Sequence, residues 1–177
     1  MDEGYIKFEA DWTKKPAFSG MQITQLLYWR RELYKLGLIG AYDEHIGYGN
    51  ISLRIGSVQE AFFISGSATG LLEKIDARHF SLVTAVDIPH NTVSCEGPLI
   101  ASSESMSHAA IYGADPMINC VMHIHHKTLW QQYLDVLPTT PAEVAYGSPE
   151  MADSLAAIIR DPAARKKGIL VTAGHEE

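Results

Sequence analysis

The sequence has only two cysteines, Cys95 and Cys120, among its 177 residues. Both lie in or beside apolar segments, which favours reduced thiols in the core and argues against a disulfide framework. No apolar run approaches the ~20 residues that a membrane span requires. The N-terminus also lacks the basic and then apolar pattern of a signal peptide. We therefore expect a cytoplasmic protein that does not enter membranes.

Positive charge is also scarce. The chain has 14 Lys and Arg residues against 21 Asp and Glu residues, which gives a formal net charge of −7. Binding to the phosphate backbone of a nucleic acid requires clustered Lys and Arg, so no nucleic-acid partner is expected. An anionic small ligand would have to find positive potential in a metal ion, a helix N-terminus or backbone amides.

Hydrophobic residues make up 46% of the chain, which is enough for one core. A single domain over residues 1–177 is expected. Apolar side chains at helical spacing predict a helix over 19–37, with a capping box of Ser19 and Gln22 at its start and Gly37 as its stop signal.

Further segments alternate between strand-like and helix-like patterns. The expected strands are 50–55, 61–65, 80–88, 91–95, 118–124 and 168–174, with hairpin turns at 56–60 and 89–91 and a loop with a short helix over 68–79. The expected helices are 102–116, 127–137 and 148–160. This order predicts an α/β fold, with a mostly antiparallel or mixed central β-sheet flanked by α-helices.

The stretch "CVMHIHHKT" places His123 and His125 at the end of a predicted strand. Side chains two apart on a strand point to the same face, so both imidazoles can reach one metal ion while Ile124 turns into the core. His126 is expected to begin the next helix. Alone, an H-x-H pair is also typical of hydrogen-bonded surface histidines.

The stretch "SSESMSHAAIY" opens a predicted helix with Ser102 and Ser103 as candidate caps and Glu104 in the first turn. Free amides at such an N-terminus, together with two serine hydroxyls, are suited to a phosphate. Glu104 would then lie near both phosphate and metal. A first-turn glutamate can also be a surface acid that interacts favourably with the helix dipole.

Taken together, "SSESMSHAAIY" and "CVMHIHH" resemble the S-S-E-x-x-x-H…H-x-H signature of the class II aldolase/adducin family, whose enzymes include fuculose-phosphate aldolase. The resemblance extends to "GNISLRI" from Gly49, to "ISGSATG" at 64–70, and to "ILVTAGH" near the C-terminus. It therefore covers most of the chain in the family's order.

The resemblance implies a zinc site and a phosphate site. The implied Zn²⁺ ligands are His123, His125 and His175, which leave coordination positions open for substrate. The implied catalytic acid and base is Glu104. The implied phosphate-binding residues are Asn50, Ser102 and Ser103, with either Ser67 or the pair Thr69 and Gly70 from the 64–70 loop.

The implied activity is that of a metal-dependent lyase, in which a small sugar phosphate undergoes reversible retro-aldol cleavage through a metal-stabilised enediolate. The family also uses a tyrosine from a neighbouring subunit as proton donor. Tyr146 lies near the expected place, although a half-buried packing tyrosine would give the same pattern. A homotetramer is expected from the resemblance.

Two departures from the family pattern keep alternatives open. The chain reads "PLIASSE" where many relatives have a basic residue and a proline before S-S-E. It also ends two residues after His175, where relatives continue with a glycine and a C-terminal helix, so we expect the native chain to continue or His175 to lie on a terminus. Related dehydratases, epimerases and non-catalytic adducin domains remain alternative interpretations.

Overall fold

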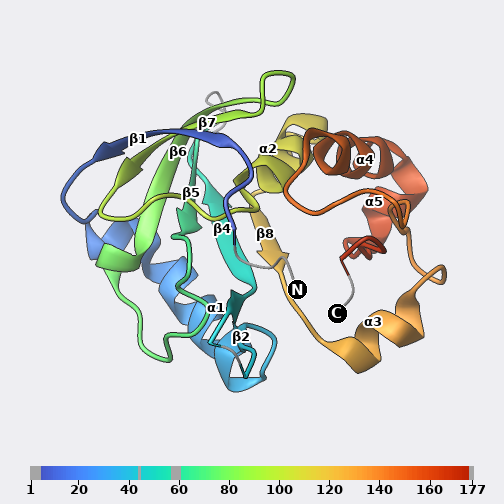
Figure 1. Ribbon diagram of the computed structural model, residues 1–177, viewed down its shortest axis with the longest axis horizontal. Helices are drawn as coiled ribbons and strands as arrows, with labels where there is room; N and C mark the ends of the chain where they lie inside the picture. The colour runs from blue at the N-terminus through green and yellow to red at the C-terminus, as the bar shows by residue number, and fades with distance from the viewer. Residues whose placement is uncertain (1–4, 44, 57–60, 176–177) are drawn as a thin grey trace.

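The computed structural model describes residues 5–43, 45–56 and 61–175 (Figure 1). Its main sheet has the strand order β1-β7-β6-β5-β4-β8, and β2 and β3 form a separate small ribbon. All neighbouring pairs of the main sheet are antiparallel except β1 and β7, which are parallel. This mixed sheet with flanking helices confirms the predicted α/β fold.

The strands are β1 (Glu9–Lys14), β2 (Gly40–Ala41), β3 (Gly47–Tyr48), β4 (Asn50–Arg54), β5 (Phe62–Ser65), β6 (Phe80–Asp87), β7 (Thr92–Gly97) and β8 (Cys120–His123). The α-helices are α1 (Thr24–Lys35), α2 (Ser105–Ala114), α3 (Lys127–Tyr133), α4 (Pro149–Arg160) and α5 (Pro162–Lys167). Two 3₁₀ turns, η1 (Gly20–Ile23) and η2 (Ala77–His79), complete the regular structure of the described residues.

Both faces of the sheet are covered, which explains the unbroken apolar run of β5. Successive strand residues point to opposite faces, so Phe62 packs in the cluster on the α2 and α4 side. Phe63 packs in the cluster that contains Leu26 and Leu33 of α1. Figure 1 shows α1 on one side of the sheet and α2 with α4 on the other. The sheet is therefore the middle layer of three.

The sequence signals at the first helix are largely confirmed. The Gln22 side chain accepts a hydrogen bond from the Ser19 backbone N–H at 3.2 Å. The turn that this pair opens is η1, and the α-helix itself begins at Thr24. Gly37 has φ +70°, the left-handed conformation expected after a helix C-terminus.

Several predicted elements were wrong or missed. Residues 168–174 form no strand, because only a single bridge joins Val171 to Thr139. Helix α3 ends at Tyr133, since Asp135 takes a left-handed φ of +59°. Strand β1 and helix α5 were not predicted. The predicted turn at 56–60 lies mostly outside the described residues.

Two predicted core residues are on the surface. Ile124 is 37% exposed and does not turn into the core. Cys120 is exposed, whereas Cys95 is buried as predicted. Cys120 begins β8 and Ile124 follows its last residue, and β8 is one of the two edge strands of the main sheet, where side chains are less covered than at its centre. Within the described part of the chain, no helix is both long enough and apolar enough to cross a membrane.

Candidate metal and anion site

Three histidines from two distant segments meet at one end of the sheet. His123 ends β8, His125 follows it in an extended segment, and His175 lies in a turn near the C-terminus. One nitrogen from each ring lies within 4.8 Å of the others. The Nε2 atoms of His123 and His125 are 2.8 Å apart. Ligand nitrogens of a tetrahedral zinc site lie about 3.3 Å apart, so this cluster has the size and donor chemistry of such a site.

Tyr42 orients His125 within the cluster. Its hydroxyl lies 2.7 Å from Nδ1 of His125, which leaves Nε2 directed at His123. An outer hydrogen bond of this kind fixes the ring and the tautomer of a metal-binding histidine. His125 is 3% exposed. Burial lowers the pKa of His125, as do the neighbouring charges of His123 and His175, so the ring is held in the neutral form that binds metal.

His175 reaches the cluster through a close approach of two backbones. A Cβ atom added at Gly174 would lie 2.0 Å from the Val144 carbonyl oxygen. Only glycine fits at that distance. The close packing of Gly174 against Val144 thus positions His175, although the strand predicted over 168–174 is not formed.

We expect Gly174→Ala to weaken zinc binding by about 10- to 100-fold without removing a ligand, the range typical for loss of groups that orient metal ligands. The added methyl group must push the backbone away from Val144 and carry His175 with it. Competition with a chromogenic zinc chelator measures the affinity. Gly113→Ala is the control, because its added Cβ would meet nothing within 4 Å. Equal zinc affinity in both variants would contradict this role.

Glu104 lies beside this cluster in a turn just before α2. It occupies the N-cap position and not the first turn that the sequence predicted, since α2 begins at Ser105. The Glu104 side chain is buried, at 5% exposure. Its Oε2 accepts a hydrogen bond from the Ser107 hydroxyl at 2.6 Å, and its Oε1 has no partner in the described structure. Burial raises the pKa of the Glu104 carboxyl, against the opposing effects of His175, Ser107 and Lys7.

A polar pocket adjoins Glu104. One wall is the loop 66–70, which is joined to the other wall by a hydrogen bond from the Ser67 N–H to the Ile100 carbonyl at 2.9 Å. Ala68 in this loop has a left-handed φ of +58°, which for a residue with a side chain costs about 1–2 kcal/mol. Such strain is typical of ligand-binding loops. The Asn50 side chain is 6% exposed, and its Oδ1 has no partner in the described structure.

Eight of the eleven residues predicted for the site line this pocket, and the other three, His125, His175 and Tyr146, lie in or against the histidine cluster. The pocket is lined by Gly47, Gly49, Asn50, Gly66, Ser67, Ala68, Thr69, Gly70, Ser102, Ser103, Glu104 and His123. Both alternatives for the 64–70 loop, Ser67 and the Thr69–Gly70 pair, are therefore present. Strand pairing explains the junction with the histidines, because Asn50 of β4 is directly opposite His123 of β8.

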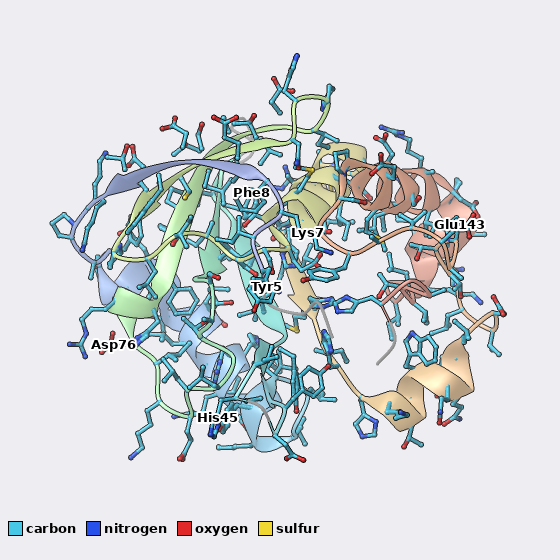
Figure 2. The ribbon with its side chains drawn as sticks, viewed as in Figure 1. Tyr5, Lys7, Phe8, His45, Asp76 and Glu143 are labelled. Atoms are coloured by element: carbon cyan, nitrogen blue, oxygen red, sulfur yellow. The ribbon has the colours of Figure 1, made fainter. Side chains whose placement is uncertain are left out.

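Tyr146 packs against the histidine cluster within its own chain. Its ring stacks on His175 with 4.7 Å between ring centroids, and the side chain is buried. Lys7, labelled in Figure 2, comes from the N-terminal segment that leads into β1. Its Nζ lies 3.7 Å from the centroid of the Tyr146 ring. This brings a cation close to Glu104, whose ionised form it favours.

Three contributors to the site were missed by the sequence analysis. Tyr42 lies in an irregular segment, and nothing in its local sequence points to His125. Lys7 precedes a strand that was not predicted. Arg30, which binds the 66–70 loop, did leave a signal: it stands between Leu26 and Leu33 at helical spacing, on the buried stripe of α1.

Another buried histidine, His108, lies outside the three-histidine cluster. His108 of α2 is almost fully buried, with Nδ1 2.6 Å from the Ser52 hydroxyl, which is also 2.6 Å from the Tyr112 hydroxyl. Burial, reinforced by the charge of His123, lowers the pKa of His108 to about 3. His108 is therefore neutral in the folded protein over the whole range in which an unfolded histidine titrates.

This shift makes stability depend on pH. Below about pH 6.5 the unfolded chain binds a proton at His108 that the folded chain does not, so the free energy of unfolding falls as pH falls. We expect a loss of about 1.4 kcal/mol per pH unit from this residue between pH 6 and 4. Urea denaturation of chelator-treated protein measures it. His108→Gln should flatten the slope by that amount and exposed His90→Gln should not; equal slopes in all three proteins would contradict the assignment.

The sequence is similar to one known protein family and to two curated enzymes. A model of the class II aldolase and adducin N-terminal domain family matches residues 24–175. A methylthioribulose-1-phosphate dehydratase of Leptospira interrogans serovar copenhageni is 29% identical over 103 residues. The corresponding enzyme of serovar Lai is 28% identical over the same length. Each match covers 54% of this chain but only 41% of the relative.

Solved structures share the fold at low sequence identity. YgbL of Klebsiella pneumoniae, a candidate aldolase, epimerase or decarboxylase, has a TM-score of 0.62 at 18% identity, covering 90% of this chain and 78% of that one. An L-fuculose 1-phosphate aldolase has a TM-score of 0.61 at 20% identity, covering 90% and 74%. The family match covers most of the chain and includes the histidine cluster, Glu104 and the polar pocket, so this protein belongs to the class II aldolase and adducin N-terminal domain family.

Proposed function

We propose that the protein is a zinc-dependent carbon–carbon lyase of the aldolase type, which catalyses reversible retro-aldol cleavage of a small sugar phosphate. The observation that carries this proposal is the convergence of a buried carboxyl group, Glu104, with a three-histidine cluster at one end of a polar pocket. A purely structural or binding domain has no physical need for a buried acid beside three neutral imidazoles.

Each part of the site has a role in this proposal. His123, His125 and His175 would hold the metal ion, which when bound supplies a Lewis acid that polarises a substrate oxygen. The hydroxyls of Ser102 and Ser103, the Asn50 side chain and the 66–70 loop would bind the phosphate. Anchoring this remote group orients the reacting carbon atoms, because binding energy away from the chemistry reduces the entropy cost of alignment.

Glu104 would move the proton of the substrate hydroxyl. Its Oε1 is directed away from the hydrogen bond that Ser107 gives to Oε2 and remains available as acceptor. The raised pKa of this carboxyl brings it nearer to neutral pH, where a general base exchanges protons most effectively. Tyr146, whose ring stacks on His175, would act as the proton donor.

Dehydration of a sugar phosphate is the second candidate. The relatives matched by sequence carry the name methylthioribulose-1-phosphate dehydratase, which favours this reaction. Both reactions begin when a base removes a proton from a substrate bound at the metal and phosphate sites. The residues described above fit either one, and the pocket on the aldehyde side decides between them.

The test is a screen of the purified, zinc-analysed chain with ketose phosphates of four to six carbons and with methylthioribulose 1-phosphate, read by mass spectrometry. Cleavage gives two smaller fragments, dehydration gives a product lighter by one water, and epimerisation leaves the mass unchanged. Fragments from a ketose phosphate support the aldolase. A product lighter by water supports the dehydratase, and absence of zinc would refute both.

A cytoplasmic homotetramer is part of the proposal. Support comes from apolar side chains that lie exposed around β8 and α3, among them Met122, Ile124 and Leu129. Apolar groups gathered at an edge strand are suited to a subunit contact. Sedimentation of the zinc-loaded protein as a monomer would contradict it.

A further inference from the structure

Arg30 is a charged residue where the fold calls for an apolar one. It stands on the stripe of α1 that packs against the sheet and is 1% exposed. Arginine is almost never fully buried unless it is paired, because removal of the charge from water is costly. Burial accordingly lowers the pKa of Arg30. Its placement calls for a compensating partner.

The contacts of Arg30 lead to the polar pocket. One terminal nitrogen, Nη2, donates hydrogen bonds to the carbonyl oxygens of Thr69 and Gly70, both at 2.9 Å. The guanidinium carbon lies 4.7 Å from the centroid of the Tyr34 ring. The other terminal nitrogen, Nη1, has no hydrogen-bond partner in the described structure. The guanidinium therefore lies directly behind the loop that lines the pocket.

Among the described residues, no carboxylate neutralises this charge. None of their ion pairs involves Arg30, and its pKa is influenced by burial and by Tyr34 without a contribution from an acid. The residues that line the pocket include neither lysine nor arginine. The chain thus keeps an uncompensated cation behind a pocket whose own surface carries hydroxyls, amides and one acid.

We propose that Arg30 is a positioning residue for the anionic group of the substrate, and that a bound phosphate monoester is the counter-charge of its guanidinium. The two hydrogen bonds fix the Thr69 and Gly70 carbonyls and thereby the position of the loop that lines the pocket. The positive charge then acts through the loop in a medium of low polarity, where charge interactions are strong. This inference rests on the proposed function, in that it assigns an anion to the same pocket.

The test is the binding of inorganic phosphate to the chelator-treated 177-residue chain, followed by ³¹P NMR or calorimetry. Removal of metal leaves the pocket as the phosphate site. We expect Arg30→Met to weaken phosphate binding by at least about ten-fold, because it removes both the charge and the loop contacts. Arg30→Lys keeps the charge and should stay within about three-fold of the parent. The matched control is Arg31→Met, since Arg31 is the exposed neighbour on the same helix.

The possible outcomes distinguish failure of the role proposed for Arg30 from failure of the proposed function. Phosphate affinity unchanged in Arg30→Met would overturn the inference while leaving the pocket and the lyase proposal intact. An equal loss in Arg30→Met and a folded Arg30→Lys would overturn the role of charge, even where the methionine variant folds poorly. If the parent chain binds no phosphate, the anion pocket itself is refuted, whereas zinc content and cleavage activity test the lyase separately.

Discussion

Replacement of His125 by alanine is expected to abolish stoichiometric zinc binding and to lower turnover by more than about 10³-fold. His125 is the most buried of the three proposed ligands, held by Tyr42 on one side and facing His123 on the other. Two remaining imidazoles cannot enclose a zinc ion as three can. Loss of a Lewis acid removes several kcal/mol of stabilisation from the transition state, and each 1.4 kcal/mol is a factor of about ten.

Zinc content by mass spectrometry and turnover of the substrate found in the screen are the two measurements. His90→Ala is the matched control, because its imidazole is exposed on a loop and binds Asp87. This control should keep both zinc and activity. Full zinc content in a folded His125→Ala protein would mean that the histidine cluster is not the metal site.

Replacement of Glu104 by glutamine is expected to lower turnover by about 10²- to 10⁴-fold while zinc content stays unchanged. Glutamine has the same shape and can still accept the Ser107 hydrogen bond, but it cannot take up a proton. In the parent enzyme, turnover should fall as pH falls through the raised pKa of Glu104, because the protonated acid is no longer a base. That acidic limb should be absent from the residual activity of the variant.

The same substitution should make the metal-free protein more stable at neutral pH. A carboxyl whose pKa is raised on folding holds its proton more tightly in the folded chain, so stability falls as pH rises from the unfolded pKa through the folded one. Glutamine has no charge to bury and avoids this loss. Urea denaturation at pH 5 and pH 8 measures it, with exposed Glu150→Gln as control. Lower stability of Glu104→Gln at pH 8 would contradict the assignment.

The layers of the fold could be predicted because most elements carry a local signal. The apolar stripe of α1 indicates that one face of the helix is buried, and the unbroken apolar run of β5 indicates that both faces of the strand are buried. Strand β1 has no such signal, because "EADWTK" is mostly exposed and is held by parallel pairing with β7, about 80 residues away. Helix α5 was missed because Asp161 and Pro162, which mark the end of α4, also cap the next helix.

The site could be predicted to the extent that its residues form compact motifs. S-S-E and H-x-H each span three residues, and these two motifs were enough to indicate a shared pocket. His175 could be named only through the family resemblance, since its position depends on the close packing of Gly174 against Val144. Tyr42 and Arg30 contact residues 83 and 39 positions away in the chain. The spacing of Arg30 on α1 indicates that it is buried, but no local pattern names the partner of either residue.

Under the proposed function, the pairing of β4 with β8 would limit the length of the substrate between its phosphate and its metal-bound end. Asn50 and His123 are directly opposite each other in this pairing, so a residue proposed to bind the phosphate and a residue proposed to bind the metal lie on adjacent strands. The backbones of Asn50 and His123 cannot shift along each other unless β4 and β8 change their register. Under the proposed function, this pairing would fix the distance between the phosphate of a substrate and its reacting carbonyl.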